Sequence, residues 1–181
     1  IEELERMGLS QMEWGGHQSR TFLSQDLIVV SPGVDLKIDP IQEALKKGIQ
    51  VISEVELACR FIQIPIIAVT GTNGKTTTTS MTYHLCKHGG ADCALVGNIG
   101  MSIAKQVALD PKELYVAEIS SFQLDDIDGF RPDVAVMTNI TEDHLDRYGY
   151  KFENYIKAKF NIVPDKQRLL IKANVTQKSK A

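Results

Sequence analysis

Residues 66–79, with the sequence IIAVTGTNGKTTTT, combine three kinds of local structure in a fixed order. The run up to Thr70 is apolar and β-branched, which predicts a buried strand, and the glycines at positions 71 and 74 predict a tight loop. The residues after the loop are compatible with a helix that reaches about Lys87. A strand, a loop and a helix in this order are typical of α/β proteins with a parallel sheet.

The same loop carries groups that bind a nucleotide phosphate. Glycines let backbone N–H groups close round an anion, the helix N-terminus adds a partial positive charge, and Lys75 adds a full one. The hydroxyl of Thr76 can ligate magnesium. The motif lacks the first glycine of the P-loop pattern, because Val69 stands there. We interpret it as a nucleoside triphosphate site, and the alternative is an ordinary turn with a surface lysine.

The composition excludes several other classes of protein. The 181 residues are 43% hydrophobic and 24% charged, and the net charge of -3 argues against a nucleic-acid partner. No apolar run has membrane-spanning length, and the first residues lack the order of a signal peptide. Three widely spaced cysteines suggest neither a disulfide framework nor a zinc site. We expect a cytoplasmic monomer that is not inserted in a membrane.

Strand and helix patterns alternate along most of the chain. Strands are predicted at residues 27–30, 50–52, 66–70, 91–96, 114–119, 134–138 and 168–171. Helices are predicted at residues 1–7, 40–47, 53–59, 75–87, 102–109 and 152–162. The tail from Lys172 is expected to fray. This pattern predicts a doubly wound α/β fold, in which ligands collect at the carboxyl ends of the strands. A domain boundary is expected near residues 60–65.

Two groups of polar residues follow predicted strands. Glu118 ends an apolar strand, where a buried carboxylate needs a positive partner such as Mg²⁺. Capping of the helix that begins near Ser120 is the alternative for this residue. His144 lies with acidic neighbours after the strand at 134–138, and it is a candidate for metal binding or substrate orientation, with a structural role as the alternative. Lys157 and Lys159 lie on the next helix and by default face solvent.

Four motifs occur in an order that resembles a known family. They are GTNGKT at 71–76, GNIG at 97–100, EISSFQL at 118–124 and NITEDHLDRY at 139–148. Together they resemble the Mur ligases, over about residues 27–171, and EISSFQL is most similar to the members that add D-glutamate. The resemblance implies that residues 1–64 are the later part of a Rossmann-like N-terminal domain that binds the UDP-linked substrate. Residues 65–181 would be the first part of the central P-loop-type ATP-binding domain, without the C-terminal ligase domain.

The resemblance also implies an activity. Such a ligase adds D-glutamate to UDP-N-acetylmuramoyl-L-alanine in peptidoglycan precursor synthesis, using ATP and Mg²⁺, through an acyl phosphate that leaves ADP and phosphate. The protein must neutralise charge on the transferring phosphoryl group and hold two anions in line. Because the C-terminal ligase domain would be absent, the chain alone is expected to be inactive. Two alternatives stay open: another amino acid ligase of the family, and a nucleotide-binding module without catalysis.

Site residues follow from the resemblance, position by position. The nucleotide would be held by Gly71, Thr72, Asn73, Gly74, Lys75, Thr76 and Thr77. The catalytic residues would be Lys75, His144 and Lys159. The metal ligands would be Thr76, Glu118, His144 and a carbamylated Lys159, with Lys157 as the alternative to Lys159. The UDP-linked substrate would be bound by Ser31, Gly33, Asn98, Ser120 and Gln123.

Overall fold

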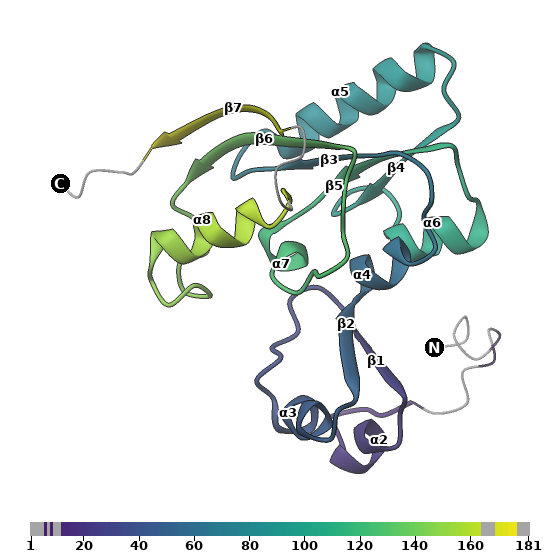
Figure 1. The fold of residues 1–181 in the computed structure, drawn as a ribbon, viewed down its shortest axis with the longest axis vertical. Helices are drawn as coiled ribbons and strands as arrows, with labels where there is room; N and C mark the ends of the chain where they lie inside the picture. The colour runs from purple at the N-terminus through teal and green to yellow at the C-terminus, as the bar shows by residue number, and fades with distance from the viewer. Residues whose placement is uncertain (1–5, 7, 9–11, 164–168, 177–181) are drawn as a thin grey trace. The chain divides into compact units, whose positions relative to one another are not determined.

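The computed structural model describes residues 6, 8, 12–163 and, for the backbone, 169–176 (Figure 1). The chain packs as two compact units. One unit comprises residues 1–28 and 34–51, and the other comprises residues 29–33 and 52–181. Within the described residues, no helix combines the length and the apolar character needed to cross a membrane.

The described residues of the smaller unit include helices α2 and α3, and the strand predictions near it are confirmed. Strands β1 (Leu27–Val30) and β2 (Gln50–Ser53) pair as a two-stranded sheet. Helix α3 (Asp39–Lys46) has a proline in its first turn and packs against α2 (Ser19–Leu23). The sequence did not predict α2, because a single short turn of helix shows no periodicity. The predicted helix at residues 1–7 lies almost wholly outside the described residues.

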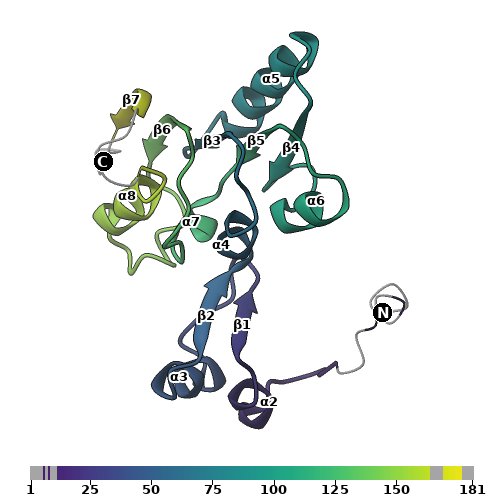
Figure 2. The same ribbon diagram turned by 45° about the vertical axis from the view of Figure 1, so that its right-hand side comes forward.

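The larger unit is a five-stranded parallel sheet in the order β4-β5-β3-β6-β7. Its strands are β3 (Ile66–Thr70), β4 (Cys93–Gly97), β5 (Leu114–Glu118), β6 (Val134–Thr141) and β7 (Leu169–Thr176). Its helices are α4 (Glu54–Cys59), α5 (Lys75–His88), α6 (Ile103–Leu109), α7 (Ser121–Leu124) and α8 (Phe152–Phe160). Helix α5 covers one face of the sheet, and the other four helices lie on the opposite face (Figures 1 and 2). The predicted doubly wound arrangement is therefore confirmed.

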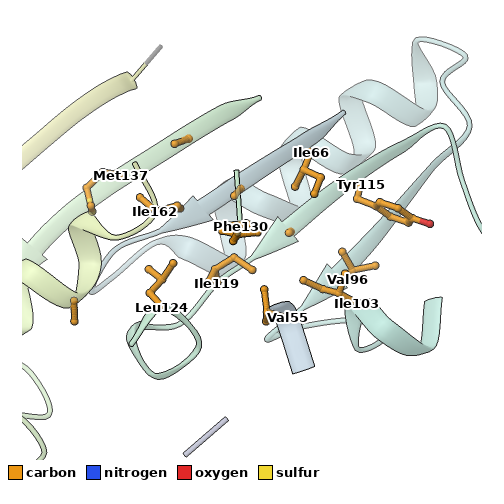
Figure 3. Packing of buried hydrophobic residues seen from close by; sticks show 14 of the residues in the cluster. Val55, Ile66, Val96, Ile103, Tyr115, Ile119, Leu124, Phe130, Met137 and Ile162 are labelled. Atoms are coloured by element: carbon orange, nitrogen blue, oxygen red, sulfur yellow. The ribbon is translucent and has the colours of Figure 1, made fainter. Parts of the chain in front are cut away.

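The hydrophobic core of this unit lies between the sheet and the helices opposite α5. Fully buried side chains include Ile119 and Phe130 from the segments after β5, and Ile162 just after α8 (Figure 3). Val55 and Ala58 of α4 belong to the same core. Because β3, β5 and β6 are covered on both faces, they read as near-continuous apolar runs.

Helix α4 is held on the larger unit by two carboxylates as well as by its apolar residues. Glu54 Oε1 accepts a hydrogen bond from the N–H of Ala104 at 2.6 Å. Glu56, which is buried, accepts hydrogen bonds from the N–H groups of Asp128 and Gly129. By packing, α4 thus belongs with the sheet that follows it, and the domain boundary between residues 64 and 65 stays a prediction.

Glu56→Ala is expected to lower the free energy of unfolding by about 1–3 kcal/mol, because two backbone donors would lose their acceptor. Urea denaturation measures this change. Glu113→Ala is the matched control, since Glu113 is exposed, and its effect should stay within about 0.5 kcal/mol. Equal stability of the two variants would contradict the role given to Glu56.

Two strands are longer than the sequence predicted. β6 continues through Thr141, whereas a loop was predicted from residue 139. β7 reaches Thr176, so the expectation of a frayed tail from Lys172 is wrong for residues 172–176. Each extension pairs with the other: residues 139–141 of β6 pair with residues 174–176 of β7, after a register shift near Met137. Residues 177–181 lie outside the described residues.

Candidate functional site

The loop between β3 and α5 has a backbone that requires glycine. Gly71 has a φ of 143°, and a Cβ there would lie 2.0 Å from Oγ1 of Thr138. Gly74 has a φ of 79° and precedes α5 as its N-cap, with no side-chain capping bond. The first bond from residue i to i−4 runs from Thr78 N–H to the Gly74 carbonyl. The N–H groups of residues 75–77 therefore have no such helical partner, which suits an anion.

The first half of the loop is tied to β6. Thr72 N–H donates to the Asn139 carbonyl at 2.9 Å, and Asn73 N–H donates to Asn139 Oδ1 at 3.0 Å. Thr72 Oγ1 also donates to the carbonyl of Thr141 at 3.1 Å. On the other side of the loop, Lys75 Nζ donates to the Thr72 carbonyl at 2.8 Å. The N–H groups of two predicted nucleotide ligands, Thr72 and Asn73, are thus bonded to protein.

Lys159 is buried against this loop, contrary to the default expectation that it faces solvent. Its side chain is 2% exposed, and its Nζ donates to the Gly71 carbonyl at 2.8 Å and lies 3.4 Å from Oγ1 of Thr70. Lys157, two residues earlier on α8, is exposed. The burial pattern of α8 separates the two lysines, because residues 152, 155, 158 and 159 point inward.

Burial, together with the nearby charge of Lys75, lowers the pKa of Lys159 from its ordinary value to about 7. Asp143 and Glu118 act in the opposite direction. These charges therefore lie within electrostatic reach of the Lys159 amine, although Lys75 begins α5 and Asp143 follows β6. The ring of Tyr155 lies 5.3 Å from Nζ and supplies part of the apolar surroundings.

Glu118 ends β5 beside the loop and is 1% exposed. In the sheet it lies level with Val69 of β3 and Gly97 of β4. Its Oε1 accepts a hydrogen bond from Asn98 Nδ2 at 2.8 Å, whereas its buried Oε2 has no hydrogen-bond partner in the part of the chain that the structure describes. A buried carboxylate oxygen without a partner is costly, and a bound cation would satisfy it. Asn98, predicted to contact substrate, contacts Glu118 in this structure.

His144 is not joined to the other predicted metal ligands. Its side chain is 53% exposed, its ring packs 5.1 Å from that of Phe122, and its Nε2 lies 3.5 Å from Oδ2 of Asp143. No hydrogen bond or ion pair links it to Glu118 or Lys159 in the described part of the chain. Nor do any three His, Cys, Asp or Glu side chains converge on one point there.

The predicted substrate residues fall in two places. Ser120 and Gln123 form the capping box of α7: Ser120 Oγ accepts from Gln123 N–H, and Gln123 Oε1 accepts from Ser120 N–H. This bonding gives both residues a structural role. Ser31 and Gly33 follow β1, where Gly33 has a φ of 91°. Substrate contact by these residues stays a prediction.

A parallel sheet with a glycine loop between its central strand and the next helix defines a P-loop-type α/β protein. The family model described as the Mur ligase middle domain matches residues 69–178, and the model described as the Mur ligase MurD-like N-terminal domain matches residues 1–53. The chain belongs to the Mur ligase family.

The chain is similar to curated proteins named UDP-N-acetylmuramoylalanine–D-glutamate ligase. The protein from Christiangramia forsetii is 47% identical over 154 residues, which cover 84% of this chain and 35% of the relative. The protein from Cytophaga hutchinsonii is 50% identical over 164 residues, which cover 90% of this chain and 36% of the relative. The chain thus spans only about a third of the length of these relatives.

Solved structures of similar fold are also Mur ligases. The alanine ligase MurC from Thermotoga maritima has a TM-score of 0.54 and 23% identity, covering 93% of this chain and 39% of its own. The ligase MPL from Neisseria meningitides has a TM-score of 0.58 and 20% identity, covering 94% and 59%. At these identities the likeness shows the fold alone.

Proposed function

We propose that the full-length protein is an ATP-dependent ligase that adds D-glutamate to UDP-N-acetylmuramoyl-L-alanine. The observation that carries the proposal is the buried Lys159 on the Gly71 carbonyl, within electrostatic reach of Glu118, whose Oε2 has no hydrogen-bond partner among the described residues. The choice of D-glutamate is supported by the names of the relatives that are about half identical to this chain. We further propose that the protein acts as a cytoplasmic monomer.

ATP would bind with its terminal phosphates against the loop at residues 71–77. The helix N-terminus at residues 75–77 offers N–H groups, and Lys75 offers a full positive charge beside them. Gly71 also supports nucleotide binding at this loop, because its lack of a side chain lets the loop lie close against β6 and keep this conformation. The task of these groups is to hold the γ-phosphate in line with the attacking carboxylate.

The residues present fit a magnesium ion. Glu118 and Thr76 would hold it, because Mg²⁺ prefers oxygen ligands and shares them with phosphate and water. Too few His, Cys, Asp or Glu side chains gather among the described residues to bind it alone. When bound, the ion neutralises charge on the phosphates. Asn98 bonds one oxygen of Glu118 and leaves the other available.

Lys159 would act as a carbamate. The ammonium first loses a proton. The neutral amine then attacks the carbon of CO₂: an N–C bond forms, one C=O π bond breaks with its electron pair moving to oxygen, and the nitrogen loses a second proton. The product is an anion suited to face a metal. The lowered pKa, about 7, supports this step because only the neutral amine is a nucleophile. His144 stays a proposed ligand of a second metal. Its exposed ring would have to reorient from Phe122.

In the proposed reaction the substrate carboxylate attacks the γ-phosphate, giving an acyl phosphate and ADP. The amine of D-glutamate then attacks the acyl carbon, an amide bond forms and phosphate leaves. Lys75 and the loop N–H groups stabilise charge on the phosphoryl group during the first step. Ser31, Gly33, Ser120 and Gln123 would position the UDP-linked substrate, with Asn98 near its acyl end.

The function is tested by measuring ADP release from the full-length protein. Release is expected only when ATP, UDP-N-acetylmuramoyl-L-alanine and D-glutamate are all present. L-Alanine and meso-diaminopimelate, offered in place of D-glutamate, test the alternative ligases. Release with one of these and not with D-glutamate would contradict the proposed substrate. ADP binding without any amino-acid-dependent turnover would favour a nucleotide-binding module instead.

Glu118→Gln is expected to weaken metal binding at the nucleotide site. Glutamine keeps the size and the contact with Asn98, but it presents no charge to a cation. Electron paramagnetic resonance of Mn²⁺ with ADP should show Mn²⁺ affinity at least about tenfold weaker than in wild type, a loss of about 1.4 kcal/mol. Glu113→Gln, at an exposed site, is the control. Unchanged Mn²⁺ affinity in Glu118→Gln would contradict the assignment.

A further inference from the structure

Asn139, in the extended part of β6, bonds the nucleotide loop through its backbone and both polar atoms of its side chain. Its carbonyl accepts from Thr72 N–H at 2.9 Å. Its Oδ1 accepts from Asn73 N–H at 3.0 Å, and its Nδ2 donates to the Asn73 carbonyl at 2.8 Å. The side-chain amide therefore pairs with the main chain of Asn73 as a neighbouring strand would.

This pairing requires a side chain that donates and accepts at the same reach. An aspartate would accept from Asn73 N–H, but its second oxygen would face the Asn73 carbonyl without a hydrogen to donate. A hydroxyl is too short, and glutamine carries its amide on a chain that is one carbon longer. The bonding groups of Asn139 are thus matched to the backbone of Asn73.

The residues on both sides of Asn139 reinforce the attachment. Thr138 Oγ1 donates to the Asn73 carbonyl at 2.7 Å, and Thr141 N–H donates to Thr72 Oγ1 at 3.0 Å. The N–H groups of Thr72 and Asn73 already donate hydrogen bonds to Asn139 within the protein. The phosphate contacts are consequently left to N–H groups that come later in the loop, and their placement depends on how the first half is held.

We propose that Asn139 is a positioning residue that holds the loop in its nucleotide-binding conformation. The inference rests on the proposed function, because it presumes that the loop binds ATP. Asn139 acts only through Thr72 and Asn73 and need not touch the nucleotide. Because Asn139 bonds the main chain of Asn73 from β6, the order of this part of the loop does not depend on nucleotide contacts alone. Without Asn139, part of the binding free energy is lost to that ordering.

The test is titration calorimetry of ADP into the full-length protein. Asn139→Ala is expected to raise the Kd for ADP about tenfold, or about 1.4 kcal/mol. Asn139→Asp, which preserves the volume, is expected to raise it further because it adds a negative charge near the phosphates. The KM for ATP should rise in parallel, while the KM for UDP-N-acetylmuramoyl-L-alanine stays within about twofold. Loss of folding alone would not separate the two KM values.

Asn161→Ala is the matched control, because the Asn161 amide donates to the Leu124 carbonyl at 2.9 Å and, among the described residues, makes no hydrogen bond to the loop. Its Kd for ADP should equal that of wild type. Hydrogen exchange of the Thr72 and Asn73 amides should accelerate in Asn139→Ala and stay unchanged in Asn161→Ala.

The outcomes separate this inference from the proposed function. If wild type binds ADP and both Asn139 variants bind it equally well, the positioning role is wrong and the ligase proposal stands. If Asn139→Ala does not fold, hydrogen exchange of the Thr72 and Asn73 amides in Asn139→Asp decides the question, because faster exchange reports a loosened loop whatever the added charge does to ADP binding. If wild type itself does not bind ADP, the proposed function fails, and this inference fails with it.

Discussion

Lys159→Ala in the full-length protein is expected to lower kcat for ligation by a factor on the order of 10³, while the Kd for ADP changes little. The amine lies on the Gly71 carbonyl and not at the helix N-terminus that we assign to the phosphates. Its loss should therefore stop acyl phosphate formation and spare nucleotide binding. Steady-state ADP release and ADP titration measure the two quantities separately.

Lys157→Ala is the control for that variant, because Lys157 lies on the same helix but is exposed. Its kcat should stay within about twofold of wild type. Normal turnover by Lys159→Ala would contradict the catalytic role proposed for Lys159. A Lys157→Ala protein that loses turnover would move the role to Lys157.

The pKa of Lys159 also gives a pH dependence with a definite sign. In the folded chain it is about 7, below the ordinary lysine value of 10.5, so between these pH values the unfolded chain holds the proton more often. Stability contributed by this site therefore rises with pH from about 7 to 10.5. Lys159→Met carries no charge at this position and should lose this dependence. The variant should therefore exceed wild type in stability by the largest margin below pH 7. Urea denaturation of unmodified protein in CO₂-free buffer measures it.

Gly71→Ala is expected to have the largest effect on the fold of the site. The added Cβ would lie 2.0 Å from Thr138 Oγ1, and alanine would have to adopt a φ of 143°. Strain and overpacking together should cost roughly 2–5 kcal/mol of unfolding free energy. ADP binding should also fall, because the clash pushes the loop away from β6. Urea denaturation and ADP titration measure the two effects.

Two further variants identify the cause of the Gly71→Ala effect. Gly16→Ala adds a Cβ in open space without a positive φ, and it should change stability by less than about 0.5 kcal/mol. Combining Gly71→Ala with Thr138→Ala removes the clashing hydroxyl but keeps the backbone strain, so only part of the stability should return. Normal ADP binding by Gly71→Ala alone would contradict the loop geometry.

Much of the larger unit was predictable because its signals are local. β3, the glycine loop and α5 follow from adjacent residues, although four consecutive threonines are poor helix formers. In α5, Thr79 and Thr82 bond the carbonyl four residues back, which keeps their hydroxyls satisfied within the helix. The position of Glu118 at a strand end beside the loop also followed from the parallel order of strands.

Other features were not predictable, because they depend on pairing between distant segments. Residues 139–141 carry no strong strand signal and become strand only by pairing with β7 and by bonding the loop. The burial of Lys159 depends on which face of α8 points inward, and the residue pattern alone did not predict that for a charged residue, whereas the family resemblance implied a role for Lys159 at the site. The sequence did not predict a role for Asn139. In its motif the acidic residues and the histidine are the groups expected to bind a metal, whereas the bonds of Asn139 connect residues 66 positions apart.

We propose that the loop, Glu118 and Lys159 form one centre in the full-length protein. Carbon-13 NMR of the full-length protein in labelled bicarbonate tests it most directly. We expect a carbamate resonance that is absent in Lys159→Ala and that broadens when Mn²⁺ and ADP are added to wild type, but not when they are added to Glu118→Gln. A missing carbamate resonance, or one that Mn²⁺ and ADP leave sharp in wild type, would contradict the account.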